Sequence, residues 1–267
     1  MDSLIAVHAK VRGPIFSVKL PEAFQVAATS IVPQPSSLVG ALAYCLALSQ
    51  DISSSEAMNK AQKITLAARA TITSEVNTLS PVLLRRFRVL DKGFETKKKG
   101  ERPPYTRLLE LIASGNAWEA KRVLDLEMTD ALYREYYFSQ ELLCSWILSE
   151  PIPSTVIKLL MRLGDTESLC NVVEAWAEDA RIGDSVKLNT KYPVAIENAV
   201  KTEGTYVLSK MCDEARSIRV YAIPCRREMK TTAKGIRYFA FTPSEVSVEF
   251  SKPVKYVETS NGLITLR

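Results

Sequence analysis

The sequence of 267 residues is poor in the side chains on which most catalytic and metal sites depend. Its one histidine, His8, excludes a His-Glu-x-x-His helix or a cluster of cysteines and histidines with metal-ligand spacing. A lone histidine in an alternating strand pattern is more often structural than catalytic. The five cysteines are scattered singly, which favours free thiols in a reducing cytoplasm over disulfides or zinc. We therefore expect a cytoplasmic protein that needs no metal or cofactor.

Long apolar runs and phosphate-loop motifs are also missing. The longest apolar run, residues 38–48, has about eleven residues, well short of the roughly 20 that cross a bilayer. Residues 1–4 offer no basic segment before an apolar core, so a secretory signal is not expected. No Gly-x-x-x-x-Gly-Lys pattern is present, which weighs against a nucleotide hydrolase.

Charge is unevenly distributed along the chain. Lysine and arginine (35) exceed aspartate and glutamate (30), a net charge of +5 that is too small to identify a partner by itself. The bases cluster at 85–107 and 226–237, whereas the acids concentrate at 119–130 and 174–179. This separation favours an interaction with a polyanion at the basic segments.

Hydrophobic patterns predict an α+β protein with mostly antiparallel strands. One helix is expected to begin at Ser36 or Ser37. Further helices are expected to span 54–69, 105–114, 117–127 and 154–163, and the last of them would have Ser154 or Thr155 as its cap. Strands are expected at 4–12, 70–73, 81–90, 168–173, 217–223, 235–241, 246–250 and 263–266. The segment 133–148 fits a strand or a helix.

The stretch PQPSSLVGALAY, residues 33–44, combines two prolines with an apolar helix. We expect Ser36 or Ser37 to cap this helix and Gly40 to allow close packing against the sheet. Open amides at a helix start also accept phosphate, and Arg12 and Lys19 precede this helix in the chain. Capping alone explains most such serines, so from the residues both interpretations stay open.

Two further basic segments could follow a nucleic-acid backbone. One extends from the strand at 81–90 into a polar stretch rich in Gly and Pro, and the other is expected in a hairpin turn. A solvated loop is an equally good interpretation of each. The candidate RNA-binding residues in these segments are Arg85, Arg86, Arg88, Lys97, Lys98, Lys99, Arg102, Arg226, Arg227, Lys230, Lys234 and Arg237.

Several motifs resemble those of the CRISPR-associated Cas-five family of the RAMP superfamily, and the archaeal type I-A branch in particular. The start of the chain is similar, with Arg12-Gly13-Pro14, residues 16–21, and the proline-led Ser-Leu-Val-Gly-Ala-Leu helix start at 37–42. Residues 161–169, with Arg-Leu-Gly-Asp, and residues 134–138, with Arg-Glu-Tyr, are similar to later stretches of the family. A C-terminal glycine-rich loop is missing, a departure from the wider superfamily.

The resemblance implies a ferredoxin-like (RRM-like) domain over residues 1–215, with a basic thumb at about 85–107, and a strand-rich segment 216–267 packed on the same domain. It implies a non-catalytic foot subunit of the Cascade surveillance complex, which grips the 5′ handle of the crRNA beside the backbone and large subunits. Ser36 and Ser37 would lie near handle phosphates.

Besides a protein-only scaffold without RNA contact, two alternatives remain at this stage. The first is an endoribonuclease of the same superfamily that processes precursor crRNA with Tyr and Lys, for which Tyr44, Tyr105 and Tyr133 are candidates. The second is the related type III capping subunit, which shares the helix start. Without a histidine set, we expect no enzymatic activity.

Overall fold

The computed structural model describes residues 4–23, 27–96, 100–164 and 168–266. The chain divides into two compact units, which are described separately here. Unit 1 comprises Met1–Ser80 and Glu135–Arg267, and unit 2 comprises Pro81–Arg134. Strands β4 (Asn77–Phe87) and β5 (Thr129–Ser139) run from one unit into the other.

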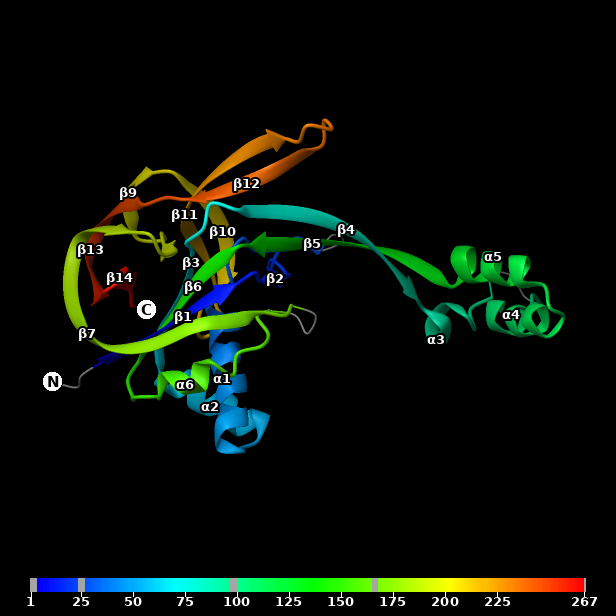
Figure 1. Cartoon of the computed structure of the whole chain (residues 1–267), viewed down its shortest axis with the longest axis horizontal. Helices are drawn as coiled ribbons and strands as arrows, with labels where there is room; N and C mark the ends of the chain where they lie inside the picture. Colours follow the sequence, from blue (N-terminus) through cyan, green and yellow to red (C-terminus); the bar gives the residue numbers. More distant parts are fainter. Residues whose placement is uncertain (1–3, 24–26, 97–99, 165–167, 267) are drawn as a thin grey trace. The chain divides into compact units, whose positions relative to one another are not determined.

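The fold is α+β, with two antiparallel sheets. The first has the order β14-β13-β7-β1-β6-β3, with β9 on β13, and the second has the order β10-β11-β12-β4-β5-β2, with β8 on β11. Figure 1 shows β7 and β13 bending along their length, so the first sheet is curled. Its strands are β1 (Leu4–Arg12), β3 (Thr65–Ile72), β6 (Glu141–Leu148), β7 (Asn171–Thr190), β9 (Ala199–Gly204), β13 (Val246–Thr259) and β14 (Gly262–Thr265). The second sheet adds β2 (Ile15–Phe16), β8 (Val194–Ala195), β10 (Tyr206–Cys212), β11 (Ile218–Thr231) and β12 (Arg237–Pro243).

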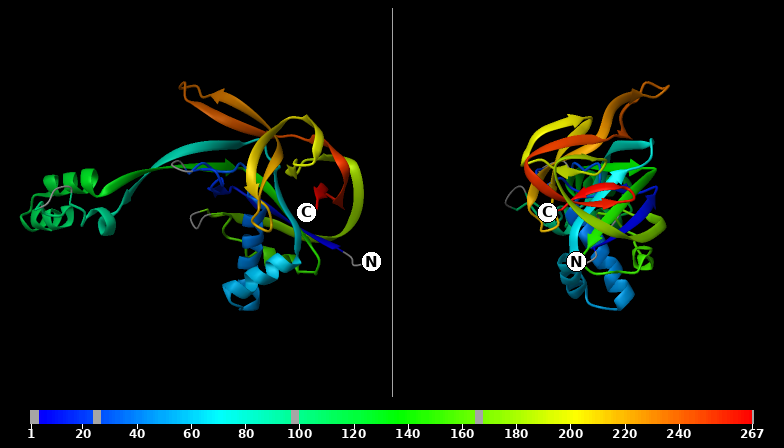
Figure 2. Two further views of the ribbon diagram at one scale, coloured as in Figure 1. Left: turned by 180° about the vertical axis from the view of Figure 1, so that it is seen from behind. Right: turned by 90° about the vertical axis from the view of Figure 1, so that its left-hand side faces the viewer.

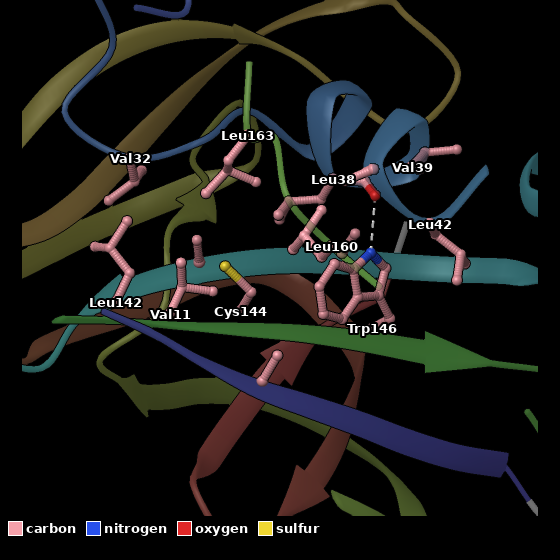
Figure 3. Packing of buried hydrophobic residues seen from close by; sticks show 14 of the residues in the cluster. Val11, Val32, Leu38, Val39, Leu42, Leu142, Cys144, Trp146, Leu160 and Leu163 are labelled. Atoms are coloured by element: carbon pink, nitrogen blue, oxygen red, sulfur yellow. Dashed lines mark hydrogen bonds between the residues drawn. The ribbon is translucent and has the colours of Figure 1, made fainter. Parts of the chain in front are cut away.

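Three helices lie against one face of the first sheet: α1 (Pro35–Gln50), α2 (Ser54–Ile64) and α6 (Ser154–Ile157). Helix α1 buries Leu38, Leu42 and Leu46 completely, and its neighbours are α2, β3 and α6. The indole N–H of Trp146 on β6 donates to the Leu38 carbonyl at 2.9 Å, as Figure 3 shows. Burial on several sides explains the nearly continuous apolar composition of α1. None of the described helices is both long and apolar enough to cross a membrane.

The start of α1 differs from the prediction. The N-cap residue is Gln34, with Pro35 in the first helical position, so Ser36 and Ser37 lie inside the first turn and do not cap the helix. Proline is favoured at that position because its missing N–H would have no helical partner. Gly40 is not needed for close packing, because a Cβ atom there would meet nothing nearer than the Met58 methyl at 3.9 Å.

The buried side chain of Gln34 joins three segments of unit 1. Its amide N–H donates to the Lys19 carbonyl at 3.1 Å, and its carbonyl accepts the Cys212 N–H at 3.0 Å. The backbone carbonyl of Gln34 accepts the Leu38 N–H at 3.0 Å, which is the first bond of α1. The loop after β2, the start of α1 and the end of β10 are thereby held at one point.

Other elements depart from their predicted bounds where tertiary pairing overrides local pattern. The helix expected at 54–69 ends at Ile64, because the following residues pair with β6 as β3. Helix α6 has four residues, with Pro153 as its N-cap in place of Ser154 or Thr155. Residues 133–148 lie in two strands, β5 and β6, while the strand expected at 81–90 ends at Phe87. Strand β7 extends to Thr190, far beyond the predicted 168–173.

Unit 2 has a small apolar core of its own. Helices α4 (Pro104–Ala113) and α5 (Ala117–Glu127) lie close to the predicted 105–114 and 117–127, and α3 (Val89–Lys92) precedes them. The buried core residues are Leu108, Ala120, Val123 and Met128. The Asn116 side chain caps α5 by accepting the Glu119 N–H.

A buried ion pair closes the free edge of β3. The Glu214 carboxylate accepts the Ala68 N–H at 2.8 Å and also pairs with the Arg69 guanidinium. Both side chains are almost fully buried. Because Glu214 occupies an edge N–H of β3, this edge cannot pair with another strand at Ala68.

We predict that Gln34→Ala lowers the free energy of unfolding by about 2 kcal/mol, because it leaves the Cys212 N–H and the Lys19 carbonyl without their partner. Urea denaturation measures the change. Gln50→Ala is the matched control, since exposed Gln50 only accepts from Lys60 Nζ. An equal decrease in the free energy of unfolding in Gln34→Ala and Gln50→Ala would contradict this role of Gln34.

Glu214→Gln should be more destabilising, by about 3 kcal/mol or more, because it leaves the buried Arg69 charge without its counter-ion. Chemical denaturation tests this against Glu203→Gln, which breaks an exposed pair with Lys201 and should change stability little. A loss for Glu214→Gln no greater than that of the control would show that the pair does not hold the β3 edge.

Candidate nucleic-acid interface

A hollow of about 380 Å³ lies beside the start of α1. It brings together Lys19 and Ser37, two of the residues predicted to bind RNA, with Tyr44 of the same helix and Arg162 from a distant loop. The remaining lining residues are Val18, Gly40, Ala41 and Gly164. The hollow therefore combines a helix start, a hydroxyl, an aromatic side chain and two cations.

Two loops distant in sequence form one wall of this hollow. The buried Ser168 hydroxyl accepts the Ser17 N–H at 3.1 Å. Gly164 has φ of 106°, and a Cβ atom there would lie 2.7 Å from a Val18 methyl. Only glycine meets both conditions without strain, so the loop that carries Arg162 is packed directly against the loop that carries Lys19. Residues 165–167 of the Arg-Leu-Gly-Asp-x-Glu-Ser motif are outside the described residues.

The electrostatics of the hollow favour an anion. Lys19 and Arg162 are exposed, and the first turn of α1 contains no acid. Pro35 has no N–H, and the N–H groups of Ser36 and Ser37 lie in the turn that has no intrahelical acceptor. Within the described part of the chain, the hydroxyls of Ser36 and Ser37 make no hydrogen bond to another group. Half-buried amides and hydroxyls at a helix start, flanked by two cations, can bind phosphate oxygens.

Arg12 lies away from this group. Its exposed guanidinium is 3.9 Å from the Glu141 carboxylate. It lines a separate hollow together with Ser74, Glu75 and Gln140. Its position before the helix in the sequence therefore does not bring it to the α1 start.

The basic residues described in unit 2 are mostly paired with acids. Arg88 contacts Asp91 at 2.8 Å and Asp130 at 3.0 Å, and the hydrogen bonds that it donates to these carboxylates raise its pKa. Arg102 contacts Glu110 at 2.9 Å. The side chains of Arg85 and Arg86, and Lys97, Lys98 and Lys99 entirely, are outside the described residues.

The third basic segment forms the predicted hairpin, with β11 paired to β12 around a turn at 232–236. Figures 1 and 2 show its tip reaching away from the rest of unit 1. All five predicted cations are exposed: Arg226, Arg227, Lys230, Lys234 and Arg237. Arg226 lies 3.8 Å from Glu228, whereas the Arg227 guanidinium carbon is 3.8 Å from the centre of the Phe239 ring.

His8 is part of a buried hydrogen-bond network. Its Nδ1 is 2.8 Å from the Ser145 hydroxyl, and its Nε2 is 3.0 Å from the Glu178 carboxylate. Ser145 in turn contacts the Tyr192 hydroxyl at 2.9 Å. Burial lowers the pKa of His8, while Glu178 acts in the opposite direction. His8 and Ser145 are fully buried, so these hydrogen bonds join β1, β6 and β7 in the interior of unit 1. Among the described residues, no group of acids, cysteines and histidines could hold a metal ion.

Sequence reasoning did not select Arg162 as a binding residue. Arg162 is far from Lys19 in the sequence. The packing of Gly164 on Val18 and the hydrogen bond from Ser17 to Ser168 bring the two loops together. The signal in the sequence was the Arg-Leu-Gly motif, whose glycine marks the tight approach.

Comparisons with known proteins find similarity to CRISPR-associated proteins. No protein-family model matches the chain. The chain is 27% identical over 219 residues to a CRISPR-associated protein Cas5 from Thermoproteus tenax, covering 82% of this chain and 84% of that protein.

Solved structures show a similar fold. A crystal structure of a CRISPR protein from Archaeoglobus fulgidus aligns with a TM-score of 0.60 at 15% identity, over 98% of this chain and 99% of that one. A chain of a CRISPR RNA-guided surveillance complex aligns with a TM-score of 0.39 and 12% identity over 90% of both chains, a likeness too low to support an argument. The chain thus has the fold of a CRISPR protein and is similar in sequence to a Cas5 protein.

Proposed function

We propose that the chain is a Cas-five (Cas5) family protein that binds RNA in a CRISPR surveillance complex. The observation that carries this proposal is the hollow in which Lys19, Arg162 and the open start of α1 converge. The similarity to the Thermoproteus tenax protein supports the family, and the likeness to the Archaeoglobus fulgidus protein supports the fold.

In finer terms, we propose a non-catalytic subunit of a type I-A Cascade that caps the 5′ handle of the crRNA and meets the backbone and large subunits. Unit 1 would correspond to the ferredoxin-like domain and unit 2 to the thumb. A backbone phosphate would accept from the Ser36 and Ser37 amides and hydroxyls, with Lys19 and Arg162 on either side. These contacts to the phosphate do not recognise the identity of a base, as expected for a site that positions an RNA end.

The double variant Lys19→Ala/Arg162→Ala should weaken RNA binding and flatten its salt dependence. Each lost phosphate contact reduces the slope of log affinity against log salt by about 0.7 for a single strand. Filter binding of a repeat-derived RNA at several salt concentrations measures both effects. The control is Lys63→Ala/Lys252→Ala, which removes the same charge from exposed positions outside the hollow. If both variants lose affinity and slope equally, the hollow is not the phosphate site.

An endoribonuclease is the second candidate function, because Tyr44 and Lys19 line the same hollow. A tyrosine and a lysine can act as proton donors and acceptors in RNA cleavage without a histidine. Tyr105 packs on Phe94 with ring centres 5.1 Å apart, and Tyr133 is exposed; both lie in unit 2.

We expect the purified chain to leave repeat RNA intact in EDTA, since Lys19 serves binding in the proposed function. Denaturing gel electrophoresis of end-labelled RNA is the measurement. A defined product that disappears with Tyr44→Phe, a variant that keeps the ring, would establish the nuclease instead. The same RNA bound uncut would favour the structural subunit, of type I or of the related type III.

A further inference from the structure

The β11–β12 hairpin carries a face that contains cations and apolar groups but no acid. Side chains alternate along a strand, so Arg227, Met229 and Thr231 share one face of β11. Their partners on β12 are Phe241, Phe239 and Arg237. The opposite face carries Arg226, Glu228 and Lys230, so the one acid of the β11 segment 226–231 lies there.

On the acid-free face, Phe239 fixes the orientation of Arg227. The Arg227 guanidinium carbon lies 3.8 Å from the centre of the ring, the distance of a stacked contact. Phe239 is itself half-buried, packs against the main core of unit 1, and pairs with Leu79 of β4. The ring is therefore anchored on the core side, while Arg227 itself is exposed to solvent.

The surroundings of Arg227 fit an unpaired base better than a phosphate alone. Met229 faces Phe239 across the hairpin and is 60% exposed, and Ile236 at the turn is 63% exposed. A phosphate gains nothing from exposed apolar groups, whereas a base can stack on a guanidinium plane and cover a neighbouring side chain. Arg237, farther toward the turn, can neutralise the adjoining phosphate.

We propose that this face of the hairpin stacks an unpaired RNA base on the Arg227 guanidinium, with Phe239 as the positioning residue. The inference rests on the proposed RNA-binding function and gives Arg227 a role different from that of a cation following the backbone. A cation needs only its charge, but stacking needs the planar guanidinium held by the ring.

Arg227→Lys tests the proposal in the full chain, because it keeps the charge and removes the plane. We expect a loss of affinity for a single-stranded repeat RNA of roughly 5- to 150-fold, the usual contribution of one stacked base, with the salt slope unchanged. Arg181→Lys, at an exposed position on β7 outside the hairpin, is the matched control and should bind as the unaltered chain does.

An RNA with an abasic nucleotide moved along its length provides the second measurement. The affinity of the unaltered chain should fall when the abasic nucleotide occupies one particular position. Arg227→Lys should show no further fall for that RNA, because the missing base and the missing guanidinium remove the same contact. Phe239→Leu should reproduce Arg227→Lys in both measurements. Thermal unfolding of each variant separates a loss of binding from a loss of folding.

Equal affinity of Arg227→Lys and the unaltered chain would overturn the stacking role and leave the proposed function intact. An unaltered chain that binds no RNA would overturn both. A loss of affinity in Arg227→Lys that adds fully to the loss at every abasic position would also contradict the proposal, because the residue would then act without the base.

Discussion

The buried amide of Gln34 is the junction on which the candidate interface depends. One side chain donates to the loop that carries Lys19 and accepts from the strand that ends at Cys212. A primary amide can do both because it carries an N–H donor and a carbonyl acceptor, whereas a carboxylate cannot donate and an apolar side chain leaves both backbone groups unpaired. The same residue begins α1, so Lys19 and Ser37 keep a fixed relation to each other. The hydrogen bonds of Gln34 thus hold in place the elements that line the hollow. Lys19 and Arg162 can therefore lie in it without contacting each other.

The net charge of the chain says little about where it can bind an anion, because many of its cations are already compensated. Arg69 is buried against Glu214, and Arg88 lies between two aspartates. Partly exposed pairs such as those of Arg88 contribute little to stability, yet they reduce the potential that a phosphate would meet. Lys19 and Arg162 differ because they line the hollow at the start of α1, whose described lining contains no acid, and Arg227 differs because it lies over the Phe239 ring. What distinguishes these three cations from the others is their position relative to acidic side chains, and not the total number of lysines and arginines.

Much of the fold could be predicted from local pattern. The helices of unit 2 and the hairpin at 226–237 followed from periodicity and turn residues, and their bounds lie close to those predicted. Prediction from local pattern was wrong where pairing with a distant strand decides the conformation. Residues 65–69, expected at the end of a helix, instead form part of β3 because they pair with β6. Local pattern also misassigned the cap of α1, although Pro35 in the first turn was a signal that the cap precedes it. Arg162 could not be placed at the site, because no local rule brings its loop to Lys19.

The hairpin also raises the question of what its exposed side chains are for. Beyond Phe239 and Ala240, where β12 pairs with β4, the two strands have no described partner except each other. Charged residues near such edges prevent unwanted strand pairing, and this explains Lys230, Lys234 and Arg237 without any ligand. It does not explain Met229 and Ile236, because exposed apolar groups work against that protection. Nor does it require a guanidinium placed 3.8 Å over the centre of a ring, which charge repulsion alone would not select. The apolar and planar parts of this face are therefore the ones that point to a ligand, and a base supplies the flat apolar surface that both of them match.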